Sequence, residues 1–80
     1  MTPADIETLI RDGIDVQSVQ VESDDNVHFA AVVVAEAFDG KRAVARHQMV
    51  YKTLGDHMRA DIHALSIRAL TPAEFDLERG

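Results

Sequence analysis

The chain has 80 residues, 46% of them hydrophobic and none of them cysteine. This composition fits one small domain with an apolar core and excludes disulfides and thiolate metal sites built from this chain alone. The formal net charge of −6 makes the chain a poor non-specific binder of nucleic acid, because neutralised phosphates supply most of that affinity.

The longest apolar run, residues 29–35, is far too short to cross a bilayer. Residues 1–5 lack the charged and apolar regions of a secretory signal. We therefore expect a single cytoplasmic domain, residues 1–80, that does not contact a membrane.

The first predicted element is a helix near the N-terminus. Thr2 offers a hydroxyl N-cap, Pro3 suits the first helical position, and Asp5 places an acid in the first turn. Gly13 offers a C-terminal stop. The apolar stripe between them is made by Ile6, Leu9 and Ile10.

Two strands are predicted next. Residues 18–22 alternate polar side chains with the apolar Val19 and Val21, which is typical of a half-buried strand. Residues 29–38 are apolar on both alternating faces for most of their length, which is typical of a central strand. The turn-forming residues 23–26 between them predict an antiparallel hairpin.

The second half of the chain begins with a turn at Asp39-Gly40. A helical stripe follows, made by Val44, His47, Tyr51, Leu54 and Met58, with Val50 beside it. Gly55 is predicted to interrupt it, leaving a main helix and a short second helix or turn. Leu65 and Ile67 indicate a strand that starts near residues 62–63, and residues 71–74 repeat the capped start of the first helix. The predicted fold is α+β, in the order α-β-β-α-(α)-β-α.

The predicted topology brings two histidines to one edge of the sheet. A strand–helix–strand unit is most often a right-handed parallel crossover, in which both strands begin at the same end. His28 opens the second strand and His63 opens the third. Because neighbouring strands lie roughly 5 Å apart, the two rings would be close enough to share a bound group.

The bases of the chain are concentrated in one segment. Residues 40–52 contain four bases and no acid, whereas residues 1–39 contain nine acids and one base. Arg42, Arg46 and Lys52 are candidate contacts for a partner carboxylate, for glutathione or for a nucleic-acid phosphate. The alternative interpretation is a solvated helix face, which is the more common role of such charges.

Several short segments follow one another at characteristic spacings: His28-Phe29, Val32–Val34, Phe38–Lys41, Arg46–Tyr51, Leu54, Ile62–Ile67 and Thr71–Phe75. Together they resemble the BolA family, and most closely its YrbA/IbaG branch. The resemblance implies a class II KH-like fold, with a three-stranded mixed sheet and helices on one face. It also implies a non-enzymatic partner of a monothiol glutaredoxin in iron–sulfur trafficking or iron sensing.

In such pairs a [2Fe–2S] cluster is shared with a glutaredoxin cysteine and a glutathione thiolate, and the resemblance implies that His63 supplies one ligand. A second ligand often comes from a loop cysteine or histidine, where this chain has residues 24–26, Asp-Asp-Asn. His28 could substitute, or Asp25, or His63 could act alone. Imidazole suits iron in a sulfur-rich site better than a lone carboxylate does, which favours His28.

Other interpretations stay open. His63 could be a structural histidine at the sheet edge, and His28 an exposed hairpin residue. The resemblance also allows a nucleic-acid-binding regulator of stress or morphology, although the Gly-x-x-Gly loop of KH domains is missing. A metal-free interaction module is a third interpretation. No nucleophile elbow, phosphate-binding glycine loop or cysteine nucleophile indicates an enzyme.

Overall fold

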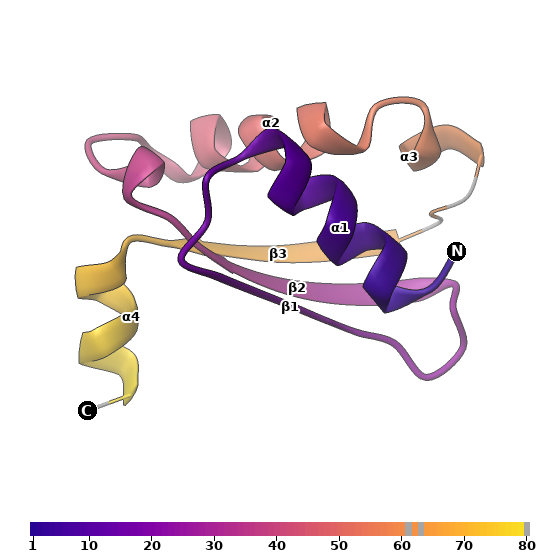
Figure 1. Ribbon diagram of the computed structural model, residues 1–80, viewed down its shortest axis with the longest axis horizontal. Coiled ribbons are helices and arrows are strands. Elements are labelled where there is room, and N and C mark those ends of the chain that lie inside the picture. The colour runs from indigo at the N-terminus through magenta and orange to yellow at the C-terminus, as the bar shows by residue number, and fades with distance from the viewer. Residues whose placement is uncertain (61, 63, 80) are drawn as a thin grey trace.

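The computed structural model describes residues 1–60, 62 and 64–79. Its three strands form one sheet, and Figure 1 shows that this sheet is curved and that helices pack against it. The order of elements along the chain confirms the prediction. The elements are α1 (Pro3–Gly13), β1 (Ser18–Glu22), β2 (His28–Val34), the 3₁₀ turn η1 (Glu36–Phe38), α2 (Ala43–Leu54), α3 (His57–Ala60), β3 (Ala64–Leu70) and α4 (Pro72–Arg79).

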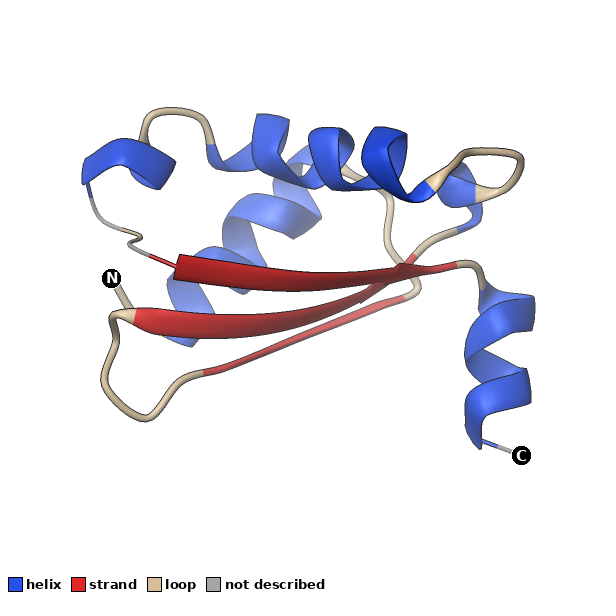
Figure 2. Ribbon diagram, turned by 180° about the vertical axis from the view of Figure 1, so that it is seen from behind, coloured by secondary structure: helices blue, strands red, loops and turns tan. Residues whose placement is uncertain are grey.

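The sheet has the strand order β1-β2-β3 and is mixed. β1 and β2 form the predicted antiparallel hairpin, with Val19 opposite Val33. β2 and β3 run parallel, with His28 opposite Ala64, so the predicted parallel pairing is confirmed and both strands begin at the same edge. Figure 2 shows the helices of the crossover lying over one face of the sheet.

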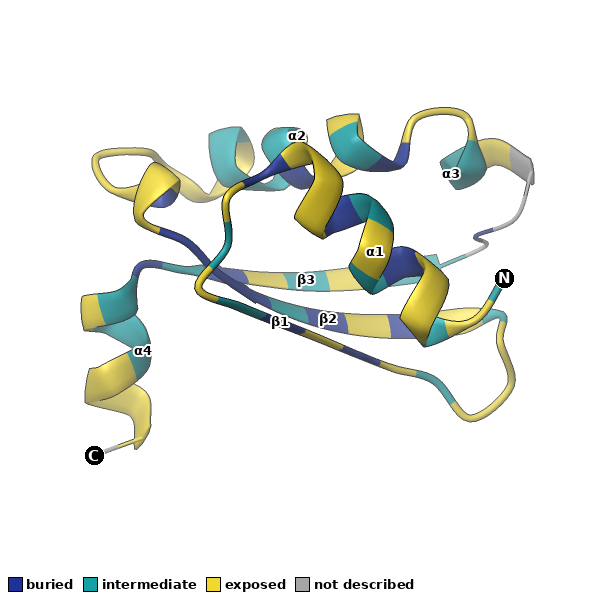
Figure 3. Cartoon of the chain, viewed as in Figure 1, coloured by how far each residue is buried: buried dark blue, intermediate teal, exposed yellow. Residues whose placement is uncertain are grey.

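The main core lies between this face and the helices α1 and α2. α1 packs against β1 and against α2, which in turn contacts β3. The predicted cap of α1 is present, because the Thr2 hydroxyl accepts from the Asp5 N–H and the Asp5 carboxylate accepts from the Thr2 N–H. Figure 3 shows the buried residues concentrated on the facing surfaces of the helices and the sheet. The largest fully buried side chains are Phe38, Ile6, Ile10, Leu54, Val33, Val34 and Val50.

The second strand is shorter than predicted. β2 ends at Val34, and the Ala35 N–H makes the last bond to β3 by donating to the Leu70 carbonyl. The chain then turns, because the Phe38 N–H donates to the Ala35 carbonyl at 3.2 Å. This turn places Phe38, which is fully buried, in the main core. The apolar character of residues 35–38 therefore reflects a buried turn and not a longer strand.

The predicted stripe on α2 is only partly correct. Val44 is 70% exposed and Tyr51 is 38% exposed, so neither belongs to the core. The buried face follows the i, i+4 positions Val50 and Leu54, and the Arg46 side chain continues it with only 13% exposure. An arginine on this face has no hydrophobic signature, so the apolar pattern identified Val50 and Leu54 but not the continuation of the buried face at Arg46.

α1 and α2 approach closely at Gly13. A Cβ atom at Gly13 would lie 2.5 Å from the Thr53 Cγ2 atom, which is too close for a van der Waals contact. Alanine normally gains about 0.5–1 kcal/mol over glycine in a helix, but overpacking costs about 1–3 kcal/mol. We expect Gly13→Ala to lower the free energy of unfolding by about 1 kcal/mol, measured by urea denaturation.

Thr53→Ser provides the control, because serine keeps the hydroxyl that bonds the Val50 carbonyl and removes the methyl group nearest to the new Cβ. Gly13→Ala should be better tolerated in this background. A stabilising effect of Gly13→Ala in the wild-type background would contradict the close packing.

α4 departs from the expected arrangement of helices on one face. Figures 1 and 2 show α1, α2 and α3 on one side of the sheet and α4 at its end, extending to the other side. On β3, Arg68 alternates with the buried Ala69 and so points away from the main core. Its guanidinium lies 2.6 Å from the Glu78 carboxylate of α4, which ties the end of α4 to this second face. In the described part of the chain, no helix has the length and apolar character needed to cross a membrane.

Candidate functional site

The sequence predicts a histidine site at the edge where β2 and β3 begin, and the structure describes one of its two histidines. His28 is the first residue of β2 and lies opposite Ala64, the first residue of β3. The Ala64 N–H donates to the Val27 carbonyl at 3.3 Å, which fixes the two strand starts side by side. His63 lies outside the described residues, so its approach to His28 stays a prediction.

His28 is well exposed and has one defined partner. Its side chain is 73% exposed, and its Nδ1 atom lies 2.9 Å from the Oδ2 atom of Asp25. The contact spans one tight turn, because Asp25 precedes His28 by three residues. The His28 ring makes no other hydrogen bond with the residues that the structure describes. Its Nε2 atom is therefore available to an external partner.

The Asp25 carboxylate is itself held by the turn between β1 and β2. Its Oδ1 atom accepts from the N–H groups of Val27 and His28, both at 2.9 Å, and from the Ser23 hydroxyl at 3.2 Å. The His28 ring and these N–H groups hold the pKa of the Asp25 carboxyl well below its usual range. Asp25 is therefore a carboxylate throughout the range in which proteins function.

An open pocket of about 390 Å³ lies beside this turn. It is lined by Glu22, Ser23, Asp24, Asp25, His28, Phe29, Ala30 and Ser66. Across residues 1–60, 62 and 64–79, no three histidine, cysteine or acidic side chains are grouped so that they could hold a metal ion. These described residues can offer a ligand to a group that another molecule also holds, but they do not build a complete site.

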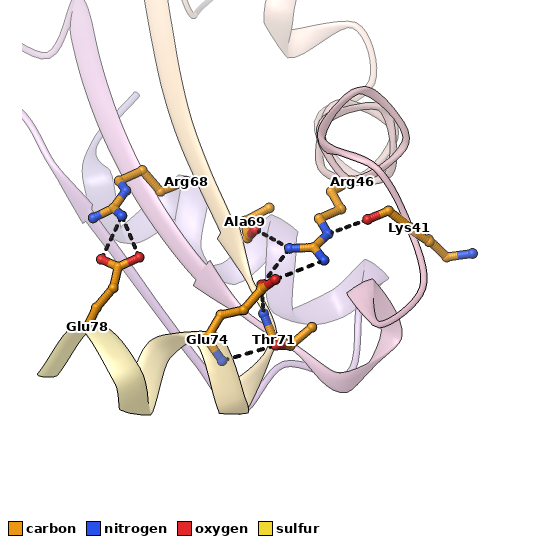
Figure 4. A network of polar contacts seen from close by, with 7 residues as sticks. All are labelled: Lys41, Arg46, Arg68, Ala69, Thr71, Glu74 and Glu78. Carbon is orange, nitrogen blue, oxygen red and sulfur yellow. Dashed lines mark hydrogen bonds and ion pairs between the residues drawn. The ribbon is translucent and has the colours of Figure 1, made fainter. Parts of the chain in front are cut away.

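Arg46 does not lie on a solvated face, because its side chain is only 13% exposed. Its contact with a partner or nucleic acid stays a prediction, although its guanidinium is already engaged within the chain. Its Nη1 atom donates to the Ala69 carbonyl at 3.0 Å and to Glu74 Oε1 at 2.6 Å, and its Nη2 atom lies 3.3 Å from Glu74 Oε2. Its Nε atom donates to the Lys41 carbonyl at 2.8 Å. Figure 4 shows that this guanidinium joins α2, β3 and α4.

The other two predicted contacts remain available. Arg42 is exposed and occupies the N-cap position of α2 without a side-chain capping bond. Lys52 is exposed near the opposite end of α2 and lines a shallow hollow with Met49 and Thr53. Ten residues of helix separate the two charges by about 15 Å along the axis. Arg42 and Lys52 therefore do not form one compact basic patch, and their contacts stay a prediction.

Glu74 completes the network that sequence analysis did not identify. The Arg46 guanidinium, followed by the Thr71 N–H, lowers the pKa of Glu74 from 4.5 to about 2. The Glu74 N–H in turn donates to the Thr71 hydroxyl oxygen at 3.2 Å, which is the cap that the motif Thr-x-x-Glu predicts. This motif predicted the start of α4, but it did not indicate that Glu74 would pair with Arg46 of α2.

The lowered pKa of Glu74 predicts an acid-dependent contribution to stability. A carboxylate whose pKa falls on folding stabilises the fold above its ordinary value of 4.5, and this contribution is lost as the pH falls to about 2. We expect the difference in free energy of unfolding between wild type and Glu74→Gln to shrink over this range, measured by urea denaturation. Glu36→Gln, at an exposed site, is the control. A difference that does not depend on pH would contradict the ion pair.

The relatives of the chain are BolA proteins. The family model for BolA-like protein matches residues 10–74. The chain is 38% identical over 76 residues to the acid stress protein IbaG of Escherichia coli K12, covering 94% of this chain and 89% of that protein. It is 48% identical over 48 residues to the DNA-binding transcriptional regulator BolA of Vibrio cholerae, covering 60% of this chain and 45% of that protein.

Coverage of the relatives differs widely. The match to SufE-like protein 1 of Arabidopsis thaliana, 47% identical over 51 residues, covers 64% of this chain but only 14% of that protein. The structure of a bolA protein homologue from Coxiella burnetii superposes with a TM-score of 0.79 at 42% identity, covering 95% of this chain and 97% of that chain. The mixed sheet, its order of elements and the matched family model show that this chain belongs to the BolA family.

Proposed function

We propose that this BolA-family chain is a non-enzymatic partner of a monothiol glutaredoxin and shares a [2Fe–2S] cluster with it and with glutathione. His28 and His63 are the ligands from this chain, and the pair acts in iron–sulfur trafficking or iron sensing. The observation that supports the proposal most is the exposed His28 ring, which lies where β2 and β3 begin together and whose Nε2 atom has no hydrogen-bond partner among the residues that the structure describes.

The residues present fit such a shared cluster. Imidazole replaces thiolate as an iron ligand in [2Fe–2S] centres of the Rieske type, so histidine is a chemically suitable ligand. The chain has no cysteine, and the described residues contain no group of three potential ligands, so the thiolates must come from elsewhere. When bound, the cluster supplies one-electron chemistry and a transferable iron–sulfur unit. This chain supplies the exposed nitrogen of His28 and the strand edge that positions it.

Anaerobic reconstitution with a monothiol glutaredoxin and glutathione tests the proposal. We expect the mixture to give absorption and circular dichroism spectra that differ from those of the glutaredoxin alone. His28→Ala and His63→Ala should each alter the spectrum and shorten the lifetime of the cluster. His47→Ala removes a partly buried histidine of α2 and serves as the control. If both ligand variants matched the wild type and the control, the ligand assignment would be rejected.

A second candidate function is DNA binding, which the name of the Vibrio cholerae relative supports. Of the bases that sequence analysis selected, Arg42 and Lys52 are exposed and can be tested without disturbing the fold. Arg46 is unsuitable, because its loss would break the network with Glu74. Salt-dependent retardation of DNA that the Arg42→Ala, Lys52→Ala double variant weakens would support this function. No retardation at low salt would exclude it.

A further inference from the structure

We infer that Asp25 is a positioning residue for His28 and not a ligand of the cluster: it holds the Nδ1 proton of the ring and thereby selects Nε2 as the atom that binds iron. The role in cluster binding rests on the proposed function. The placement of the proton, however, is a property of the isolated chain. It can therefore be tested without any partner.

The first argument is the way Asp25 is anchored. Three donors converge on its Oδ1 atom, two of them backbone N–H groups and one the Ser23 hydroxyl. Its Oδ2 atom is occupied by His28 Nδ1 at 2.9 Å. Each carboxylate oxygen offers about two acceptor positions, so the three donors saturate Oδ1. Iron bound by Oδ1 would displace at least one of them, and iron bound by Oδ2 would lie beside the His28 ring that this oxygen holds, so Asp25 is a poor ligand.

The second argument is the chemistry of the ring. Neutral imidazole carries one proton, on Nδ1 or on Nε2, and an ionised carboxylate can only accept. Because Oδ2 lies beside Nδ1, the proton is held on Nδ1, and the lone pair is presented by Nε2. Histidine ligands of metals generally donate their second ring N–H to a carboxylate or carbonyl in this way. The turn of this chain therefore already contains the support that a histidine ligand requires.

The third argument is the contrast with the neighbouring aspartate. Asp24 is also exposed and carries the same charge, but it makes no hydrogen bond or ion pair with any residue that the structure describes. If the two acids acted only through their charge on a nearby cluster, they would be equivalent. Only Asp25 contacts His28 Nδ1, so Asp25 and not Asp24 is expected to position the ring. Asp24 is thus a matched control one position away.

Asp25→Asn gives a sharp test. The amide oxygen can keep the place of Oδ1 and its backbone contacts, while the amide nitrogen takes the place of Oδ2 and turns an acceptor into a donor. His28 Nδ1 must then accept, so the proton moves to Nε2. Nitrogen-15 NMR of the histidine-labelled isolated chain, at a pH where the ring is neutral, distinguishes the two tautomers. We expect Nδ1–H in the wild type and in Asp24→Asn, and Nε2–H in Asp25→Asn.

The amide signals of Val27 and His28 report whether the turn survives in Asp25→Asn. The wild-type measurement does not depend on that variant, because an Nε2–H tautomer in the wild type would by itself overturn the inference. In the reconstituted complex, we expect Asp25→Asn to weaken cluster retention by about 10-fold and Asp24→Asn to leave it unchanged. Equal effects of the two variants would also overturn the inference.

The two claims fail in different ways. If His28→Ala leaves the cluster unchanged while the wild-type ring carries the Nδ1 proton, the ligand role of His28 is wrong although the tautomer is as inferred. If His28→Ala destroys the cluster while the wild-type ring carries the Nε2 proton, the proposed function stands and the role of Asp25 is wrong.

Discussion

Phe38→Ala is expected to lower the free energy of unfolding by about 3–5 kcal/mol, since it removes a fully buried ring from the core. Small domains have free energies of unfolding of about 5–15 kcal/mol, so this substitution would remove a large part of the stability of the fold. The ring is held in the main core by the turn η1, whose backbone bonds leave little freedom to collapse around a cavity. Urea denaturation followed by circular dichroism measures the effect.

Leu77→Ala is the matched control, because Leu77 is a large apolar residue that is 82% exposed on α4. Its truncation should change the free energy of unfolding by no more than about 0.5 kcal/mol. If the two variants lost the same stability, the packing of Phe38 in the core would be refuted.

Arg46→Ala is expected to lower the free energy of unfolding by on the order of 2 kcal/mol. The substitution removes the guanidinium that bonds the Lys41 and Ala69 carbonyls and pairs with Glu74 through two nitrogens. It also leaves the Ala69 carbonyl at the outer edge of β3 without its partner. The result should be a lower urea midpoint and a weaker attachment of α4, seen as faster amide exchange in residues 72–79.

Two further variants separate the shape of Arg46 from its charge. Arg46→Lys keeps the positive charge but loses the planar guanidinium with its several N–H donors. Its stability and its amide exchange in residues 72–79 should therefore lie between those of the wild type and Arg46→Ala. Arg42→Ala removes an exposed arginine of the same segment and should leave both readouts almost unchanged. A loss of stability in Arg42→Ala as large as that in Arg46→Ala would contradict the network.

Much of the fold was predictable because its signals are local. The caps at Thr2 and Thr71, the alternation in residues 18–22 and the interruption at Gly55 each depend on neighbours along the chain. The parallel pairing of β2 and β3 was predicted from the strand–helix–strand connection between them. The errors arose where tertiary contacts decide the outcome. Phe38 turns into the core instead of extending β2, and the buried face of α2 includes a cation.

The candidate site was predictable in position but not in detail. Topology placed His28 at the edge where β2 and β3 begin, and the structure confirms that placement. The role of Asp25 could not be read from its spacing, because an Asp-Asp-Asn turn fits a ligand, a turn former or a support equally well. Only the 2.9 Å contact with Nδ1 and the three donors on Oδ1 distinguish these roles. The partner of Arg46 was hidden for the same reason, since Glu74 is 28 residues away.

Pulsed electron paramagnetic resonance of the reduced complex tests the central claim most directly. The chain would be labelled with nitrogen-15 in its histidines only and reconstituted with unlabelled glutaredoxin and glutathione. We predict strong nitrogen-15 couplings to the cluster, reduced by His28→Ala and retained in His47→Ala. A cluster bound in the complex without any nitrogen-15 coupling would show that no histidine of this chain binds iron, and would contradict the account.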